Sequence, residues 1–225
     1  MHIKSESKDK VLSKDSPRLK NTAILPSLII LAEARNTSVN ITQKRDPLEK
    51  LFWIDMEMTG LDINKEVIIE VAVIITDLNF REFESFETVI KQPQIYLDKM
   101  DPWNTEHHAK SGLTAKVAGG MDPENAEFRL VDLVDRHFPE SKTNPRMRPI
   151  LAGNSITQDR LFIDKYFQKF SQRLHYRMLD VSSWKIIYNN KFNFEYKKMN
   201  SHRALDDIRE SIGELRTYID KIHFE

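Results

Sequence analysis

Short runs of apolar or alternating residues predict three consecutive strands in the first half of the chain. Residues 51–57 begin with four apolar side chains, and 67–76 are almost all β-branched or apolar, which is typical of buried strands. Residues 83–91 alternate between apolar and polar side chains, as a half-exposed strand does, and a polar turn at 77–79 precedes them. We expect a meander of these strands with the second strand central.

In the second half of the chain, strands alternate with helices. A period of 3.6 residues predicts an amphipathic helix over 123–137, with Phe128, Val131, Leu133 and Val134 on its apolar side. The remaining expected elements are, in order, a strand at 149–152, a helix at 157–170, a strand at 176–181, a helix at 182–188 and a helix at 201–222. Together these elements predict an α/β fold with a mixed five-stranded sheet flanked by helices.

The first 46 residues differ from the rest of the chain. They are rich in Lys, Ser, Thr and Asn and have no sustained period, so we interpret 1–46 as an extension in front of a domain spanning 47–225. One interpretation is a mitochondrial targeting segment, although the acidic residues among them weaken it, and the protein would otherwise be cytoplasmic. The other is a disordered or loosely docked extension with one short helix at 24–31.

Composition narrows the chemistry that the chain can perform. It contains no cysteine, which excludes disulfides, thiolate nucleophiles and sulfur-ligated zinc. Lys plus Arg and Asp plus Glu both number 34, so any contact with a polyanion must be local. The longest apolar run, 23–34, is interrupted by Pro26 and is too short to span a bilayer, so we expect no membrane partner. Carboxylate and imidazole chemistry remain.

Two carboxylates stand at the end of the first predicted strand. Asp55 and Glu57 are two residues apart, so their side chains leave the same face of the strand about 6.5 Å apart along it. Oxygen ligands in this arrangement can reach one divalent cation, while the alternative is a solvated strand end. Gly60, shortly after them, lets the backbone approach a ligand or take a positive φ, or else forms a tight turn.

Two later segments carry further candidate residues. Asp159 lies in the first turn of its predicted helix, where an acidic residue is also a common partner of the helix dipole. Ser155 or Thr157 could cap that helix, and Ser155 could instead contact a substrate phosphate. Asp207 lies on the border of the apolar face of the last helix, and His202 precedes it by five positions. A capping histidine and a partly buried helical aspartate are the alternative interpretation.

Four blocks of sequence resemble one family when they are taken together. They read WIDMEMTGL at 53–61, GNSITQDR at 153–160, HYRMLDVSS at 175–183 and HRALDDIRESI at 202–212. In this order they resemble the oligoribonucleases, of the DEDDh group of 3′-to-5′ exonucleases, and the match runs from about Pro47 to the C-terminus. The resemblance implies a ribonuclease H-like exonuclease fold.

The resemblance also implies an activity and the residues that perform it. Asp55, Glu57, Asp159 and Asp207 would bind two Mg²⁺ or Mn²⁺ ions, and His202 would be the general base. Two-metal hydrolysis of this kind would release nucleoside 5′-monophosphates from the 3′ ends of short oligoribonucleotides, especially dinucleotides.

Substrate contacts follow from the same resemblance. Leu61 would wedge between the two bases and Trp103 would stack on a base, unless Trp103 only covers the core. His108 and Ser155 resemble further contacts with the substrate.

The resemblance at 175–183 (HYRMLDVSS) implies a homodimer. Tyr176 and Arg177 would reach into the site of the neighbouring subunit and, with Ser182 and Ser183, cap the 5′ phosphate. Packing of Tyr176 and Leu179 into the core is compatible with this role.

Two other functions share these residues. A general 3′-to-5′ exonuclease acting on longer RNA or single-stranded DNA would keep the same carboxylates, and the Tyr176-Arg177 cap argues against it. A catalytically silent nucleic-acid-binding module would not need all five reactive residues.

Overall fold

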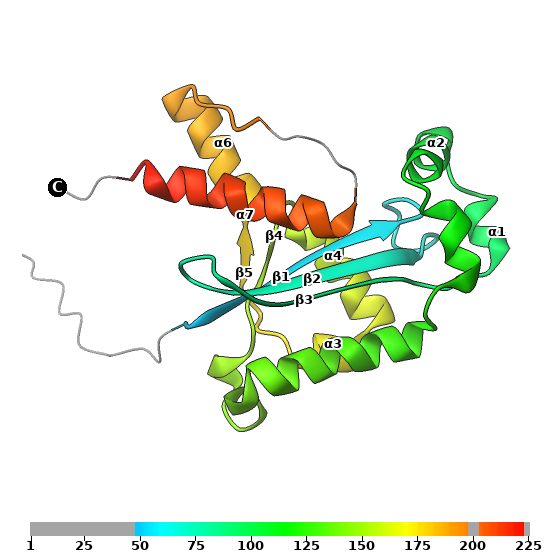
Figure 1. The fold of residues 1–225 in the computed structure, drawn as a ribbon, viewed down its shortest axis with the longest axis horizontal. Helices are drawn as coiled ribbons and strands as arrows, with labels where there is room; N and C mark the ends of the chain where they lie inside the picture. Colours follow the sequence, from blue (N-terminus) through cyan, green and yellow to red (C-terminus); the bar gives the residue numbers. More distant parts are fainter. Residues whose placement is uncertain (1–47, 198–202, 223–225) are drawn as a thin grey trace, which may run out of the picture. The chain divides into compact units, whose positions relative to one another are not determined.

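The computed structural model describes residues 48–197 and 203–222, which form a mixed sheet covered by helices (Figure 1). The strands are β1 (Lys50–Met58), β2 (Ile68–Asp77), β3 (Glu82–Val89), β4 (Leu151–Gly153) and β5 (Met178–Asp180). Their order across the sheet is β3-β2-β1-β4-β5. The first three strands are antiparallel neighbours, whereas β4 and β5 continue the sheet in parallel with β1. The predicted meander and the five-stranded mixed sheet are confirmed.

Seven α-helices are seen in the described residues. They are α1 (Gln94–Leu97), α2 (Pro102–Lys110), α3 (Pro123–His137), α4 (Ile156–Tyr166), α5 (Gln168–Ser171), α6 (Val181–Phe192) and α7 (Ala204–Asp220). Three short 3-10 helices, η1 (Thr114–Gly119), η2 (Pro139–Lys142) and η3 (Pro145–Met147), complete the connections. None of the described helices is long and apolar enough to cross a membrane.

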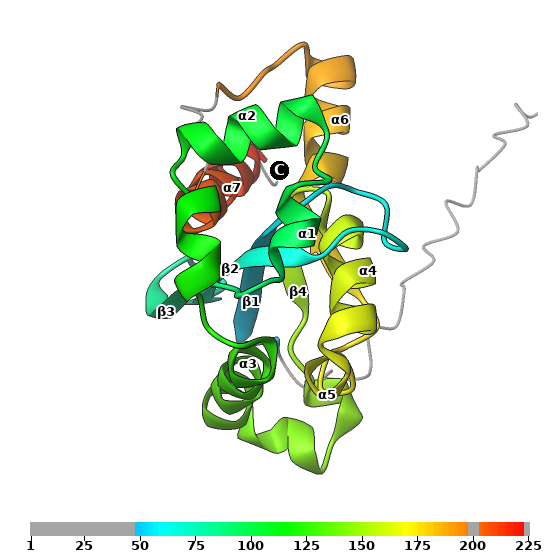
Figure 2. The same cartoon turned by 90° about the vertical axis from the view of Figure 1, so that its right-hand side faces the viewer.

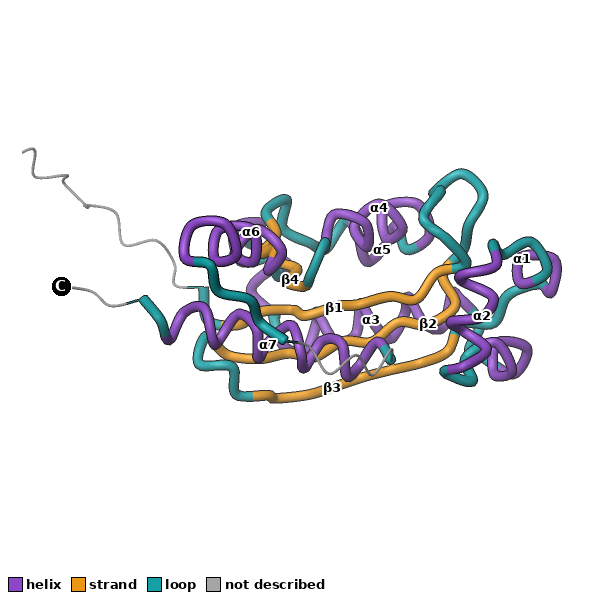
Figure 3. The backbone as a smooth tube through the Cα atoms, turned by 90° about the horizontal axis from the view of Figure 1, so that it is seen from above, coloured by secondary structure: helices purple, strands orange, loops and turns teal. Residues whose placement is uncertain are grey.

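The two faces of the sheet carry different helices. Along β1, side chains such as Phe52 and Ile54 pack with α3, α4 and α5, whereas Trp53 packs with α6 and α7. Figures 1 and 3 show α7 on one side of the three long strands and α3 on the other, and Figure 2 shows α4 and α5 beside β4. Because side chains alternate along a strand, Asp55 and Glu57 point to the same face as Trp53, toward α7.

Some predicted boundaries were wrong. The expected place of the second strand is confirmed, because β2 lies between β1 and β3, whereas several element ends differ from the prediction. The helix expected over 157–170 is interrupted at Phe167, whose φ of −123° and ψ of 61° leave the helical region. The last strand is shorter than 176–181, and the helix expected over 182–188 extends to Phe192. The expected helix at 24–31 lies outside the described residues.

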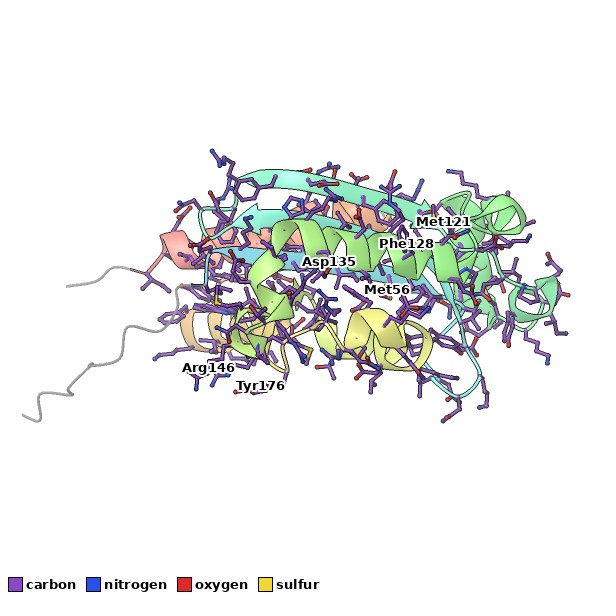
Figure 4. All side chains as sticks on the ribbon, turned by 90° about the horizontal axis from the view of Figure 1, so that it is seen from below. Met56, Met121, Phe128, Asp135, Arg146 and Tyr176 are labelled. Carbon is purple, nitrogen blue, oxygen red and sulfur yellow. The ribbon has the colours of Figure 1, made fainter. Side chains whose placement is uncertain are left out.

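The apolar side of α3 also differs from the prediction. Phe128 is 70% exposed, whereas the carboxylate of Glu127 is buried and accepts hydrogen bonds from the backbone N–H groups of Lys169 (2.6 Å) and Phe170 (3.2 Å). Figure 4 labels Phe128 on this helix. Glu127 therefore satisfies donors at the start of α5. Phe128 lies two positions from both Ala126 and Leu130 of the buried side, so it falls outside the spacing of three and four residues that defines one face of a helix.

Candidate active site

Three carboxylates meet where the end of β1 faces the start of α7. Asp55 and Glu57 come from β1 and Asp207 from the first turn of α7, and each offers an oxygen within 4.8 Å of the others. All three are half-buried. Sequence reasoning predicted this group, and the register of β1 with the sheet explains why both strand residues reach the same helix.

A fourth carboxylate lies beneath this group. Asp159, in the first turn of α4, is only 5% exposed. Burial raises the pKa of Asp159 well above its usual value, and the nearby charges of Asp55 and Glu57 raise it further, although backbone hydrogen bonds from Asp159 itself and Met56 oppose the shift. Asp159 therefore belongs electrostatically to the same cluster.

Negative charge is also crowded at Glu57. Burial first, and then the charges of Asp55, Asp207 and Glu70, raise the pKa of Glu57 to about 8, although Arg203 opposes the shift. Such a cluster is costly in a protein unless a cation or a proton neutralises it. Carboxylate oxygens converging from three elements are also the ligands that hard divalent cations prefer. The residues present therefore fit a divalent metal site.

The predicted general base, His202, lies outside the described residues. Arg203, the next residue, is the N-cap of α7, and its backbone carbonyl accepts a hydrogen bond from the N–H of Asp207 at 2.9 Å. Arg203 also donates from Nη2 to Oε1 of the buried Glu70 on β2 at 2.7 Å. Sequence reasoning missed this pair. A single charged residue inside the apolar run of 67–76 was the only signal for Glu70.

A cavity of about 540 Å³ opens beside Glu57. Leu61 and Trp103 line it and are 72% and 66% exposed, so Trp103 does not cover the core. The Trp103 ring stacks on His107 with centroids 4.6 Å apart. Gly60 also lines the cavity, but it does not take a positive φ. A Cβ at that position would lie 3.1 Å from the side chain of Glu66, so glycine leaves room for this side chain to pack close to the backbone.

His108 is buried behind the cavity and does not lie on the surface. Its Nε2 lies 2.9 Å from the carbonyl oxygen of Met58, so Nε2 carries the proton and donates to it. Burial lowers the pKa of His108, and the 3.9 Å approach of Nδ1 to Glu57 Oε2 is therefore not an ion pair at neutral pH. The buried Nδ1 has no hydrogen-bond partner in the structure.

The two serines expected near a phosphate are brought together. Ser155 adopts a left-handed conformation with φ of 52°, and its side chain does not cap α4, so that prediction was wrong. Thr157 does not cap α4 either, because it lies inside that helix. The N–H of Ser155 donates to Ser182 Oγ at 2.9 Å and to Asp180 Oδ1 at 3.1 Å. The N–H of Ser182 shares the same Asp180 oxygen at 2.9 Å, which holds the starts of α4 and α6 side by side.

Tyr176 and Arg177 are not among the residues that line the cavity beside Glu57. Tyr176 is 75% exposed, so it does not pack in the core; it stacks on His175 with centroids 4.6 Å apart, and the Arg177 guanidinium lies 5.4 Å from its ring. Arg177 lines a separate apolar groove of about 450 Å³ that also includes Trp184. Ser183 is exposed on α6. The side chains expected to act across a dimer thus project from the surface of the subunit.

Comparison with known proteins agrees with this fold. The pattern of the family RNase_T, described as exonuclease, matches residues 52–215. The solved structure of the zinc-bound exonuclease I complex with single-stranded DNA from E. coli superposes with a TM-score of 0.58 at 14% identity. That comparison covers 76% of this chain and 40% of the exonuclease I chain, so this chain spans less than half of its length, and the likeness concerns the fold alone.

Sequence relatives narrow the class. The mitochondrial oligoribonucleases of Bos taurus and Homo sapiens are each 44% identical over 180 residues, covering 77% of this chain and 73% of theirs. An oligoribonuclease of Francisella tularensis is 40% identical over 179 residues, covering 77% of this chain and 96% of its own. The chain therefore belongs to the exonuclease family and, within it, to the oligoribonucleases.

Proposed function

We propose that this protein is a 3′-to-5′ exoribonuclease that degrades short oligoribonucleotides, especially dinucleotides, to nucleoside 5′-monophosphates. The observation that carries the proposal is the carboxylate group of Asp55, Glu57 and Asp207, whose oxygens lie within 4.8 Å of one another, in a chain 40–44% identical to oligoribonucleases. Asp159, buried beside this group, completes the donor set.

The four carboxylates would hold two Mg²⁺ or Mn²⁺ ions. Such a pair would supply a nucleophilic hydroxide and would neutralise charge on the phosphoryl oxygens of the scissile bond. The raised pKa values of Glu57 and Asp159 support this assignment, because they arise from burial and, after it, from mutual repulsion, and bound divalent cations would offset both. The protein's own contribution is to aim the donors from β1, α4 and α7 at one point.

The sequence around α7 supports His202 as the general base. His202 precedes Asp207 by five positions, and an imidazole can accept a proton from the attacking water near neutral pH. Nδ1 of His108 has no partner and would accept a hydrogen bond from the 3′ end of the substrate.

The exposed side chains around the cavity would bind the bases and the 5′ end. Trp103 would stack on one base and Leu61 would separate the two. Ser155, Ser182 and Ser183, with Tyr176 and Arg177 of a second copy, would enclose the 5′ phosphate. The exposure of Tyr176 on the isolated subunit supports a homodimer in which these side chains cross to the neighbouring site.

Residues 1–46 support a mitochondrial location. The relatives from three mammals are named as mitochondrial oligoribonucleases, and residues 1–46 precede the part of this chain that matches the exonuclease family. A fusion of residues 1–46 to a fluorescent protein should enter mitochondria, whereas a diffuse cytoplasmic signal would contradict this part of the proposal.

Turnover by the full-length protein tests the activity. With Mg²⁺ present, a 5′-phosphorylated RNA dinucleotide should be converted to monophosphates faster than a seven-nucleotide RNA or a DNA oligomer, and Asp159→Ala should be inactive. Equal or faster cleavage of the long substrates would favour a general exonuclease. Absence of turnover with Mg²⁺ or Mn²⁺ would favour a module that only binds nucleic acid.

A further inference from the structure

Asn154 connects three elements through its side-chain amide. It lies between β4 and α4, half-buried, and Nδ2 donates to Ser211 Oγ at 2.7 Å and to Glu214 Oε2 at 3.1 Å, both on α7. Its Oδ1 accepts from Ser182 Oγ on α6 at 3.2 Å. The same amide thus contacts the helix that carries Asp207 and the helix that carries Ser182.

The orientation of this amide follows from its partners. Nδ2 must face Glu214, because a carboxylate accepts hydrogen bonds, and Oδ1 is therefore left to face Ser182. The only hydroxyl proton of Ser182 is then donated to Asn154, so Ser182 Oγ accepts from the N–H of Ser155 at 2.9 Å. The Ser155 hydroxyl is then the donor in its 3.3 Å contact with Ser182 Oγ, and because Ser155 is exposed, this hydroxyl can turn to donate to an anion instead.

The network ends at the metal-site helix. Ser211 accepts from Asn154 and donates its own proton to the backbone carbonyl of Asp207 at 2.9 Å. Glu214 is fully buried, and its second oxygen, Oε1, accepts a hydrogen bond from the hydroxyl of Tyr218 at 2.8 Å. Tyr218 therefore holds the carboxylate that accepts from Asn154. A continuous path of hydrogen bonds therefore runs from Ser155 to Asp207, and Asn154 is its midpoint.

We propose that Asn154 is a positioning residue that sets the separation between the serine hydroxyls and the carboxylate site, and so selects RNA of two nucleotides. This inference rests on the proposed function, in which Ser155 and Ser182 bind the 5′ phosphate while the carboxylates hold the scissile bond. A dinucleotide can satisfy both ends only if their separation is fixed. A longer RNA does not place its terminal phosphate there, so it depends on Asn154 only through the contacts of Asn154 with α7, and should be affected less.

The test compares the rates of one enzyme on two RNA lengths. For Asn154→Asp, kcat/KM for a 5′-phosphorylated dinucleotide should fall by about 10- to 100-fold, because the new carboxylate repels Glu214 and misplaces Ser182. For a seven-nucleotide RNA, kcat/KM should fall by less than about threefold. Asn144→Asp is the matched control, since Asn144 only accepts from the N–H of Arg146 at 3.0 Å, a bond that aspartate retains.

Ser211→Ala removes one hydroxyl and with it the hydrogen bonds of Ser211 to Asn154 and to the carbonyl of Asp207. This variant therefore tests the role of Asn154 even if Asn154→Asp does not fold. It should lower the dinucleotide rate selectively. The double variant Asn154→Asp/Ser182→Ala should be no worse than Asn154→Asp alone, because the two residues act together. If the ratio of dinucleotide to heptanucleotide rates in Asn154→Asp and in Ser211→Ala equals that of the wild type, the inference about Asn154 is wrong, while the proposed function stands. A wild-type enzyme without preference for the dinucleotide would overturn the proposed function, and the inference with it.

Discussion

Arg203 at the start of α7 donates a hydrogen bond at 2.7 Å to Glu70, a carboxylate that is 1% exposed on β2. Glu70 lies directly opposite Glu57 in the antiparallel pair of β1 and β2. Like charges in opposed positions destabilise a sheet, and Arg203 supplies the opposite charge. The ion pair therefore holds the start of α7, the helix that carries Asp207, against β2, which is paired with the strand that carries Asp55 and Glu57.

Glu70→Gln should weaken both folding and catalysis. Replacing the carboxylate leaves Arg203 without its charged partner and should lower the free energy of unfolding by about 1–3 kcal/mol. Loosening α7 should also lower kcat by about 10-fold or more, with little change in KM, because Asp207 is misplaced. Glu84→Gln is the matched control, because Glu84 pairs with Arg136 and His137 on the surface. Equal loss of kcat in both variants would contradict a role at the site.

Asp159→Asn should abolish turnover without unfolding the protein. The variant keeps the shape of the side chain but removes a metal ligand, so kcat should fall by at least about 1,000-fold. In the absence of metal its melting temperature should rise, because burial of a crowded carboxylate no longer opposes folding. Asp164→Asn on the same helix should retain activity, since Asp164 pairs with Arg160 on the surface. Substantial turnover by Asp159→Asn would remove Asp159 from the donor set.

The metal-free protein should lose stability as the pH rises. Burial and the neighbouring carboxylates raise the pKa of Glu57 from 4.5 to about 8, so the folded state keeps a proton that the unfolded state has lost. Stability from this group is therefore complete below about pH 4.5 and is lost as the pH rises through about 8. Urea unfolding in a chelator across this range should give that slope, and Glu57→Gln should flatten it. A stability that increases with pH would contradict the shift.

Trp103→Ala should weaken substrate binding more than chemistry. Base stacking is worth roughly 1–3 kcal/mol, so KM for a dinucleotide should rise by about 5- to 150-fold while kcat changes little. Trp103→Phe keeps an aromatic face and should recover most of the affinity. The melting temperature should not change in either variant, because Trp103 is 66% exposed. A fall in kcat with unchanged KM would show that Trp103 acts on the reacting group instead.

Two inactive variants should restore activity when they are mixed. A heterodimer of Asp159→Asn with Arg177→Ala contains one site that has intact carboxylates and receives Arg177 from the other subunit. After random exchange of subunits, roughly a quarter of all sites should be active. If Arg177 acts within its own subunit, no mixture will recover activity on the dinucleotide. Sedimentation of each variant must first establish that both remain dimeric.

The parts of the structure that were predictable from sequence depend on local pattern. β1 could be predicted from its apolar residues and from the spacing of Asp55 and Glu57. Both signals lie within the strand itself and do not depend on which strands pair with it. The role of Glu70 was not visible, because it depends on the register of β2 with β1 and on a helix far along the chain. Likewise, α2 lacks an apolar period, since only His108 of its side chains is buried.

Ser155 illustrates the same limit in another way. It precedes a helix in the sequence, and serine is a common N-cap, but the backbone at Ser155 is left-handed and its hydroxyl faces Ser182. Contacts with α6 therefore outweigh the local preference. Asn154 was similarly visible only as part of a turn, although its partners come from residues about 30 to 60 positions later.

The position of β1 in the middle of the sheet has a consequence for the durability of the site. Phe52 and Trp53 are paired with β2 on one edge and with β4 on the other, and a strand held on both edges opens later than edge strands and surface helices. Asp55 and Glu57 follow on the same strand and pair with Ala72 and Glu70 of the interior strand β2, so heat should disturb this part of the site later than the edges of the domain. Local unfolding of the exposed helix α2, which carries Trp103, would instead weaken the binding of the bases and leave the carboxylates that perform hydrolysis in place.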